Sequence, residues 1–239
     1  MYRYLFKPII VVGLAMLFLF PINSYASGYY NQHRGWVLYD NFNSGSINPD
    51  LWDIDDTSAD IFVENGRVRF NHNTAEEGDS SWLIFRKRPE NIKAVKVRVK
   101  IVQGASGDSR ARIGGWVGKD NEDNPIWQQL QVRNQFDRID CWAGALTDPP
   151  GYNTELYDVF FARFETPIDV ENEWFTLIMY FNKRELKYKA YGLGTIIHKL
   201  PQRILKFEEV FKGIGTRNSV DPGTGEIFSV YFDSVYVLY

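Results

Sequence analysis

The sequence predicts an all-β protein, an antiparallel sandwich of two β-sheets preceded by a signal peptide. Two observations carry this prediction. Short segments in which apolar and polar residues alternate recur along the chain, and turns rich in Gly, Asn, Asp and Pro separate them. Helical periodicity is almost absent, so roughly a dozen short strands have to supply the core, as in β-sandwiches and barrels.

The first segment of the chain has the features of a secretory signal peptide. Two basic residues precede an apolar run at 9–20, and a small-residue pattern ending at Ala26 follows. The run is too short to span a bilayer comfortably, which favours cleavage near Ala26 over an uncleaved membrane anchor. We therefore expect a signal peptide over 1–26 and a loose arm over 27–33. The mature protein is then secreted or periplasmic, with no membrane span.

The rest of the chain fits one domain, which we place at 34–239, because all-β sandwiches often reach roughly 200–250 residues as a single unit. The formal net charge of -3 gives no reason to expect a nucleic-acid partner. Cys141 is the only cysteine, so no intrachain disulfide forms. Its place in a period-2 pattern, with no histidine nearby, predicts a buried, inert thiol rather than a nucleophile.

The strands are expected where alternation is clearest. One further stretch, 203–215, could form a helical turn or two, with Gly213 as its stop. The expected strands are 35–42, 61–71, 81–88, 94–102, 111–118, 125–133, 138–144, 156–165, 174–182, 185–192, 195–200 and 228–239.

The segment 124–134 carries the best clue to function. Successive side chains of a strand point to opposite faces, so its apolar set can face a core while the other set meets water or a ligand. The core set is Ile126, Gln128, Leu130 and Val132, and the opposite set is Trp127, Gln129, Gln131 and Arg133.

The same alternation in the two flanking strands predicts one shared face rich in tryptophan, amide and arginine. Indole rings stack on the C–H faces of sugars, amides bind hydroxyls, and guanidinium forks suit carboxylates or sulfates. We therefore expect a polysaccharide, with acidic ones among the candidates, to bind at Arg112, Trp116, Trp127, Gln129, Gln131, Arg133, Asp140 and Trp142. In the alternative, the loop 147–155 covers the tryptophans, and Arg112 or Arg133 pairs with Asp140 in a buried salt bridge.

Short motifs near both ends of the chain support a family resemblance. An Asp40-Asn41-Phe42 opening leads to Trp52, then to Asn65-Gly66 and an apolar strand, and Asp233 lies in the last strand. In these features the chain resembles secreted concanavalin A-like lectin/glucanase sandwiches. The resemblance implies a jelly roll whose first and last strands are neighbours, with a concave face on which glycans lie.

The resemblance also implies a structural calcium site. It would use a group of the opening segment, the backbone of the Asn-Gly glycine and the last-strand aspartate, which are Asp40, Gly66 and Asp233 here. Hard oxygen ligands suit calcium, although it takes six or more of them. The alternative to a calcium site is that the two aspartates only accept hydrogen bonds in turns.

The glucanase branch of that superfamily carries Glu-x-Asp-x-x-Glu on one strand, and this sequence contains no such pattern. The residues therefore favour a non-catalytic, lectin-like carbohydrate-binding domain over an enzyme. One alternative is a glycoside hydrolase or lyase with an unfamiliar site, in which Asp140 would act with Glu155 or Asp158. Another is an extracellular structural or adhesion protein.

Overall fold

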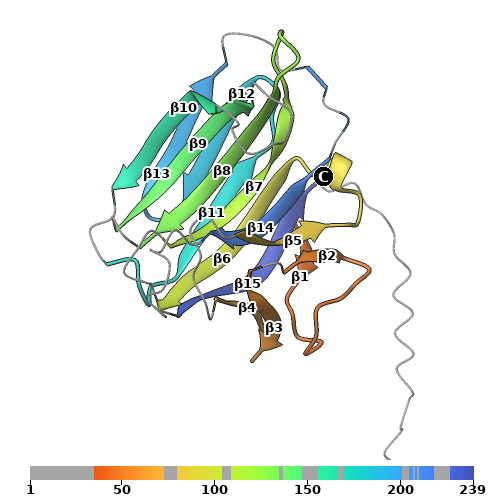
Figure 1. Ribbon diagram of the computed structural model, residues 1–239, viewed down its shortest axis with the longest axis vertical. Coiled ribbons are helices and arrows are strands. Elements are labelled where there is room, and N and C mark those ends of the chain that lie inside the picture. The colour runs from red at the N-terminus through yellow and green to blue at the C-terminus, as the bar shows by residue number, and fades with distance from the viewer. Residues whose placement is uncertain are drawn as a thin grey trace, which may run out of the picture. The chain divides into compact units, whose positions relative to one another are not determined.

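The computed structural model describes residues 35–56, 58–72, 80–103, 109–134, 137–146, 156–165, 169–200, 205–206, 208, 210–217 and 227–239. All of them belong to one compact unit, Arg34–Tyr239. They form fifteen strands and one 3-10 turn, η1 (Pro89–Asn91) (Figure 1). The predicted signal peptide and arm lie outside the described residues. In the described segments, no helix has the length and hydrophobicity needed to cross a bilayer.

The strands form two antiparallel sheets, which confirms the predicted sandwich. The eight strands of sheet A follow the order β13 (Gly194–Lys199), β12 (Glu185–Ala190), β11 (Phe175–Tyr180), β6 (Ala94–Gln103), β15 (Phe228–Leu238), β4 (Arg67–His72) and β3 (Asp60–Glu64), with β1 (Val37–Asp40) paired to β15. Val37 lies opposite Val237, so the first and last strands are neighbours, as the resemblance implies.

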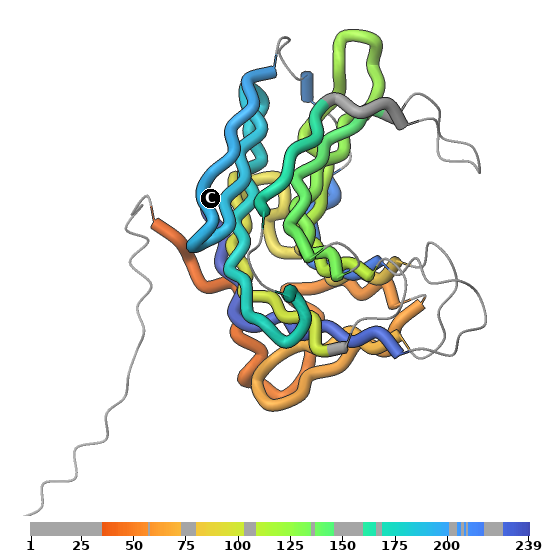
Figure 2. The backbone as a smooth tube through the Cα atoms, turned by 90° about the vertical axis from the view of Figure 1, so that its left-hand side faces the viewer, coloured from red at the N-terminus to blue at the C-terminus, as the bar shows by residue number. Residues whose placement is uncertain are grey.

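Sheet B contains seven strands and lies across the core from sheet A. Its order is β10 (Leu156–Glu165), β9 (Arg138–Leu146), β8 (Pro125–Arg133), β7 (Arg110–Lys119), β14 (Lys212–Arg217), β5 (Ser80–Phe85) and β2 (Trp52–Asp55). Figure 2 shows the green strands of sheet B facing the blue and cyan strands of sheet A. The outer face of sheet B is therefore free to carry a site.

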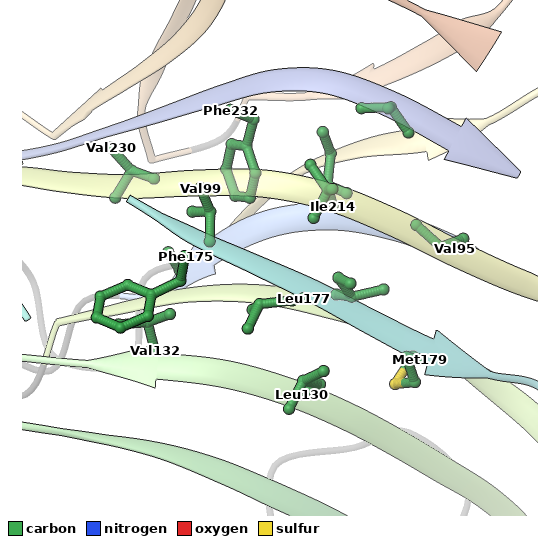
Figure 3. Close-up of a cluster of buried hydrophobic side chains, with 14 of the residues drawn as sticks. Val95, Val99, Leu130, Val132, Phe175, Leu177, Met179, Ile214, Val230 and Phe232 are labelled. Carbon is green, nitrogen blue, oxygen red and sulfur yellow. The ribbon is translucent and has the colours of Figure 1, made fainter. Parts of the chain in front are cut away.

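The inward-facing apolar residues of both sheets form one core. Val99 and Leu177 of sheet A meet Leu130 and Val132 of sheet B in Figure 3, and all four are fully or almost fully buried. Each such side chain contributes roughly 1.5–3 kcal/mol when it leaves water. The alternation in β8 thus places its apolar residues in the core, as predicted.

Two polar residues also face this core. Gln128 is buried, and its Nε2 donates a hydrogen bond to the carbonyl oxygen of Tyr180 across the sandwich at 3.0 Å. Cys141 is a free, buried thiol whose pKa is raised by burial and by the neighbouring charge of Asp140. A thiol in this state is a poor nucleophile, which agrees with the sequence.

The helical turn expected within 203–215 is wrong for the part of that stretch the structure describes. Lys212–Arg217 forms β14, which pairs with β5 and β7 in the middle of sheet B. Gly213, the predicted helix stop, is a strand residue.

Candidate functional site

A cleft of about 470 Å³ lies on the outer face of sheet B. This size is within the range of roughly 300–1,000 Å³ that is typical of ligand sites. The cleft contains every predicted ligand-binding residue except Asp140. Its lining comprises Arg110, Arg112, Trp116, Trp127, Gln129, Gln131, Arg133, Trp142, Phe161 and Arg217.

Strand pairing explains why these side chains converge. Residues directly opposite one another on neighbouring strands share a face. Trp116 of β7 lies opposite Trp127 of β8, and Gln129 of β8 lies opposite Trp142 of β9, which in turn lies opposite Phe161 of β10. Aromatic and amide groups thus occupy one end of the cleft across four strands.

Trp127 is the centre of the aromatic end. Its ring makes edge-on contacts with Trp116 and Trp82, at centroid distances of 5.1 and 5.6 Å, and it lies 5.3 Å from Phe211. Its Nε1 donates a hydrogen bond to Oε1 of Gln129 at 3.3 Å. Trp127 is therefore partly a packing residue, whereas Phe161 at the rim is 49% exposed and offers an open aromatic surface.

Glycines in the sheet make room for the indoles. A Cβ atom on Gly114 would lie 2.5 Å from Cζ2 of Trp127 and 2.7 Å from Cη2 of Trp82. Trp82 also lies over Gly215, which is opposite it in the sheet. Because these strands lack side chains here, both rings can lie close to the backbone and form an apolar floor.

Trp82 was not among the residues predicted for this face. Its alternation with Leu83 and Phe85, which are in the core, places it on the outer face of sheet B, although it is only 7% exposed. Trp82 has a low exposed fraction because its ring lies against the backbone of Gly114, Gly213 and Gly215.

The opposite end of the cleft is cationic. Arg217 of β14 lies opposite Arg110 of β7, which lies opposite Arg133 of β8, and Arg133 lies opposite Arg138 of β9. Four arginines thus cross the sheet in one row. Like charges directly opposite one another destabilise a sheet, so such a row needs compensating anions.

Arg112 lies one row further into the cleft, opposite Gln131. It is only 5% exposed, and its guanidinium carbon lies 4.1 Å from the centre of the Trp82 ring. Its Nη2 donates hydrogen bonds to Ser80 Oγ at 2.7 Å and to the Thr216 carbonyl at 3.0 Å. Burial, followed by the charges of Arg217 and Arg110, lowers the pKa of Arg112 well below its usual value.

Asp140 is fully buried beside the cleft and does not line it. One of its oxygens lies 2.9 Å from Nη1 of Arg133, and the other lies 2.8 Å from Nε of Arg138. The buried salt bridge considered as an alternative therefore exists for Arg133. For Arg112 it does not, since none of the salt bridges within the described residues includes Arg112.

The two aspartates predicted to bind calcium already have other partners. Asp40 accepts hydrogen bonds from the backbone N–H of Phe42 and from the indole of Trp52, both at 2.8 Å. Asp233 lies 3.8 and 3.5 Å from the guanidinium groups of Arg67 and Arg98. Within the described residues, no cluster of three or more His, Cys, Asp or Glu side chains could hold a metal. As placed, these groups do not fit a calcium site, and calcium binding stays a prediction.

The fold is that of the concanavalin A-like jelly rolls. The chain is similar to the catalytic domain of an endo-1,3-beta-glucanase (laminarinase) from Thermotoga petrophila RKU-1, at 13% identity with a TM-score of 0.59, covering 86% of this chain and 98% of that one. It is also similar to the kappa-carrageenase from Pseudoalteromonas carrageenovora, at 13% identity with a TM-score of 0.58, covering 90% and 98%.

A third similar structure is the Bacillus licheniformis beta-glucanase, at 11% identity with a TM-score of 0.53, covering 86% of this chain and 98% of that one. No protein-family model matches the sequence, and neither does any curated protein. At such low identity these similarities show the fold alone. They confirm the expected jelly-roll fold and give no information on the chemistry of the cleft, which has to be inferred from its own residues.

Proposed function

We propose that this protein is a secreted, non-catalytic polysaccharide-binding protein whose ligand lies in the cleft of sheet B. The observation that carries the proposal is the convergence of indole, amide and guanidinium groups in one open cleft. Oε1 of Gln131 is buried there and has no hydrogen-bond partner among the described residues. Buried polar atoms normally have partners, and a sugar hydroxyl is a donor of the required kind.

The described lining of the cleft favours binding over hydrolysis. It includes no Asp or Glu side chain, and Asp140 is sealed by Arg133 and Arg138. Glycoside hydrolysis normally needs two carboxyl groups, about 5 Å apart in retaining enzymes and roughly 6.5–9.5 Å apart in inverting ones. Asp140 as placed is a structural counter-ion.

A polysaccharide-degrading enzyme is the second candidate. The similar solved structures include a laminarinase, a kappa-carrageenase and an endo-β-galactosidase, so this fold supports glycan cleavage in other proteins. Glu155, a predicted partner for Asp140, lies outside the described residues. The side chain of Asp158 does as well.

Trp142→Ala tests the binding proposal, because Trp142 lines the cleft beside Phe161 while Trp127 is tied into the aromatic packing. We expect electrophoretic retardation in polysaccharide-containing gels to fall about 10-fold, with little change in melting temperature. Trp174→Ala is the matched control, since Trp174 contacts Arg67 and Arg98 and lies outside the cleft lining. Equal retardation of wild type and Trp142→Ala would contradict the proposal.

The same samples separate the two candidate functions. Release of reducing ends, or ultraviolet absorbance from unsaturated uronates, across a polysaccharide panel would establish the enzyme. Retardation without either signal is the result expected of a binding protein.

A further inference from the structure

Arg112 is unusual because it is a buried cation without a carboxylate. Among the described residues its only hydrogen-bond acceptors are the Ser80 hydroxyl and the Thr216 carbonyl, both bound to Nη2, and its Nε has no partner. Buried charges in proteins are normally paired, because their desolvation costs several kcal/mol. The side chain lines the cleft, so a ligand can supply the missing charge.

The surroundings of Arg112 strengthen the positive potential. In the two rows at this end of sheet B, the strand register places six arginines, Arg110, Arg112, Arg133, Arg138, Arg163 and Arg217, against three carboxylates, Asp55, Asp140 and Glu165. Two of these carboxylates are already in ion pairs, Asp140 with Arg133 and Arg138, and Glu165 with Arg163. The described part of this region therefore carries three more positive than negative charges, six minus three.

The position of Arg112 within the cleft determines which part of a bound sugar would contact it. Arg112 lies between the arginine row and the aromatic floor, with the Trp82 ring beneath its guanidinium. This contact holds the guanidinium in place. Because Nη2 already donates to Ser80 and Thr216, Nη1 is the donor left to meet an anionic group. A sugar stacked on the tryptophans would place a ring substituent toward this guanidinium.

We propose that the Arg112 end of the cleft is a subsite for a carboxylate or sulfate group, so that the natural ligand is an anionic polysaccharide. The inference rests on the proposed function and narrows its substrate class. The neutral part of each sugar lies on the aromatic end, and the anionic substituent binds Arg112, flanked by Arg110 and Arg217.

The first test compares charged and neutral forms of the same polymers. Polygalacturonate is matched with its carboxyl-reduced form, and dextran sulfate with dextran, at constant ionic strength in affinity gels. We expect one anionic polymer to bind about 10- to 100-fold more tightly than its neutral form, as charge-assisted hydrogen bonds require. The polygalacturonate and dextran sulfate arms distinguish a carboxylate subsite from a sulfate subsite.

The second test assigns the preference to Arg112. Arg112→Gln should lower the ratio of anionic to neutral polymer affinity to about one. Arg98→Gln, on sheet A, is the control and should change neither. If Arg112→Gln fails to fold, Arg110→Gln and Arg217→Gln test the same charge from less buried positions. Intrinsic tryptophan fluorescence should also change when sodium sulfate or sodium glucuronate is titrated into the wild type at constant ionic strength, because Arg112 lies over the Trp82 ring, and glucose should have no effect.

The outcomes are separable. Equal affinity for charged and neutral polymers, or an Arg112→Gln variant that loses both equally, overturns the anionic subsite while the binding function stands. Failure of every polymer in the wider panel to bind overturns the proposed function, and the subsite with it.

Discussion

The indole of Trp82 lies against the backbone of Gly215, where a Cβ atom would stand 2.6 Å from Cε3 of the ring. The two residues are opposite each other in β5 and β14. The glycine therefore fixes the height of the ring above the sheet, and with it the depth of the cleft floor.

Gly215→Ala should displace this ring and destabilise the domain. Overpacking by one methyl group in a close-packed site costs about 1–3 kcal/mol, which urea unfolding followed by circular dichroism would measure. Near-ultraviolet circular dichroism should change as well, because Trp82 contacts Trp127 edge-on. An alanine variant with wild-type stability and spectrum would show that the ring has room to move.

Asp140→Asn should be strongly destabilising, because the side chain is the buried counter-ion of two arginines. Removing one partner of a buried ion pair costs roughly 3–5 kcal/mol. Glu165→Gln removes the exposed partner of Arg163 and should cost less than about 1 kcal/mol. Thermal unfolding of both variants and of the wild type measures the two losses of stability. A stable Asp140→Asn protein that had lost glycan cleavage would instead identify Asp140 as catalytic.

Lys212 should make stability depend on pH in the alkaline range. Burial lowers its pKa from 10.5 to about 8, while its Nζ donates hydrogen bonds to the carbonyls of Pro89 and Ile92. Between these two pKa values the unfolded chain binds more protons at Lys212 than the folded one, so the free energy of unfolding should rise from about pH 8 toward pH 9, where the raised pKa of Cys141 begins to oppose the trend. Urea unfolding at several pH values measures the slope.

Lys212→Met should flatten that slope, whatever its effect on absolute stability. Cys141 opposes the trend above about pH 9 in both proteins, because burial raises the pKa of its thiol. Tyr39 does so above pH 10, because burial raises its pKa to about 12 and its stabilising contribution is lost as pH rises from 10 through that value. If the free energy of unfolding changed with pH in the same way in wild type and in Lys212→Met, Lys212 would be excluded as the source of the pH dependence.

Chelation tests the calcium prediction. Because the carboxylates of Asp40 and Asp233 are occupied by indole, backbone and guanidinium donors, we expect EDTA to leave the melting temperature unchanged. A fall of several degrees that added calcium reverses would establish the ion and show that Arg67 and Arg98 move aside.

The alternation of apolar and polar residues predicted the orientation of side chains correctly wherever one face of a strand is buried in the core. In β8, the apolar residues Leu130 and Val132 alternate with Gln129 and Gln131, so parity alone predicted which side chains share the cleft. The first and last strands were likewise expected to pair from short motifs at the two ends. Such elements are predictable because local alternation and tertiary burial agree.

The residues that sequence reasoning missed depend on contacts between distant strands. Trp82 was not predicted for this face, and the stretch that contains the start of β14 was expected to form a helical turn that stops at Gly213. The two misses have one cause: the glycines of β14, Gly213 and Gly215, leave room for the indole of Trp82, which lies far away in the sequence. Arg217 could not be placed beside Arg112 until β14 was known to be a strand.

The position of β15 bears on how the chain reaches its native state. It lies between β6 and β4 in the middle of sheet A and also pairs with β1, so the last of the fifteen described strands is an interior one. Sheet A cannot close until β15 is present, and pairings this distant in sequence slow folding. A nascent chain lacking Phe228–Leu238 would expose the pairing edges of both neighbouring strands, which makes incomplete chains natural targets for chaperones and proteases.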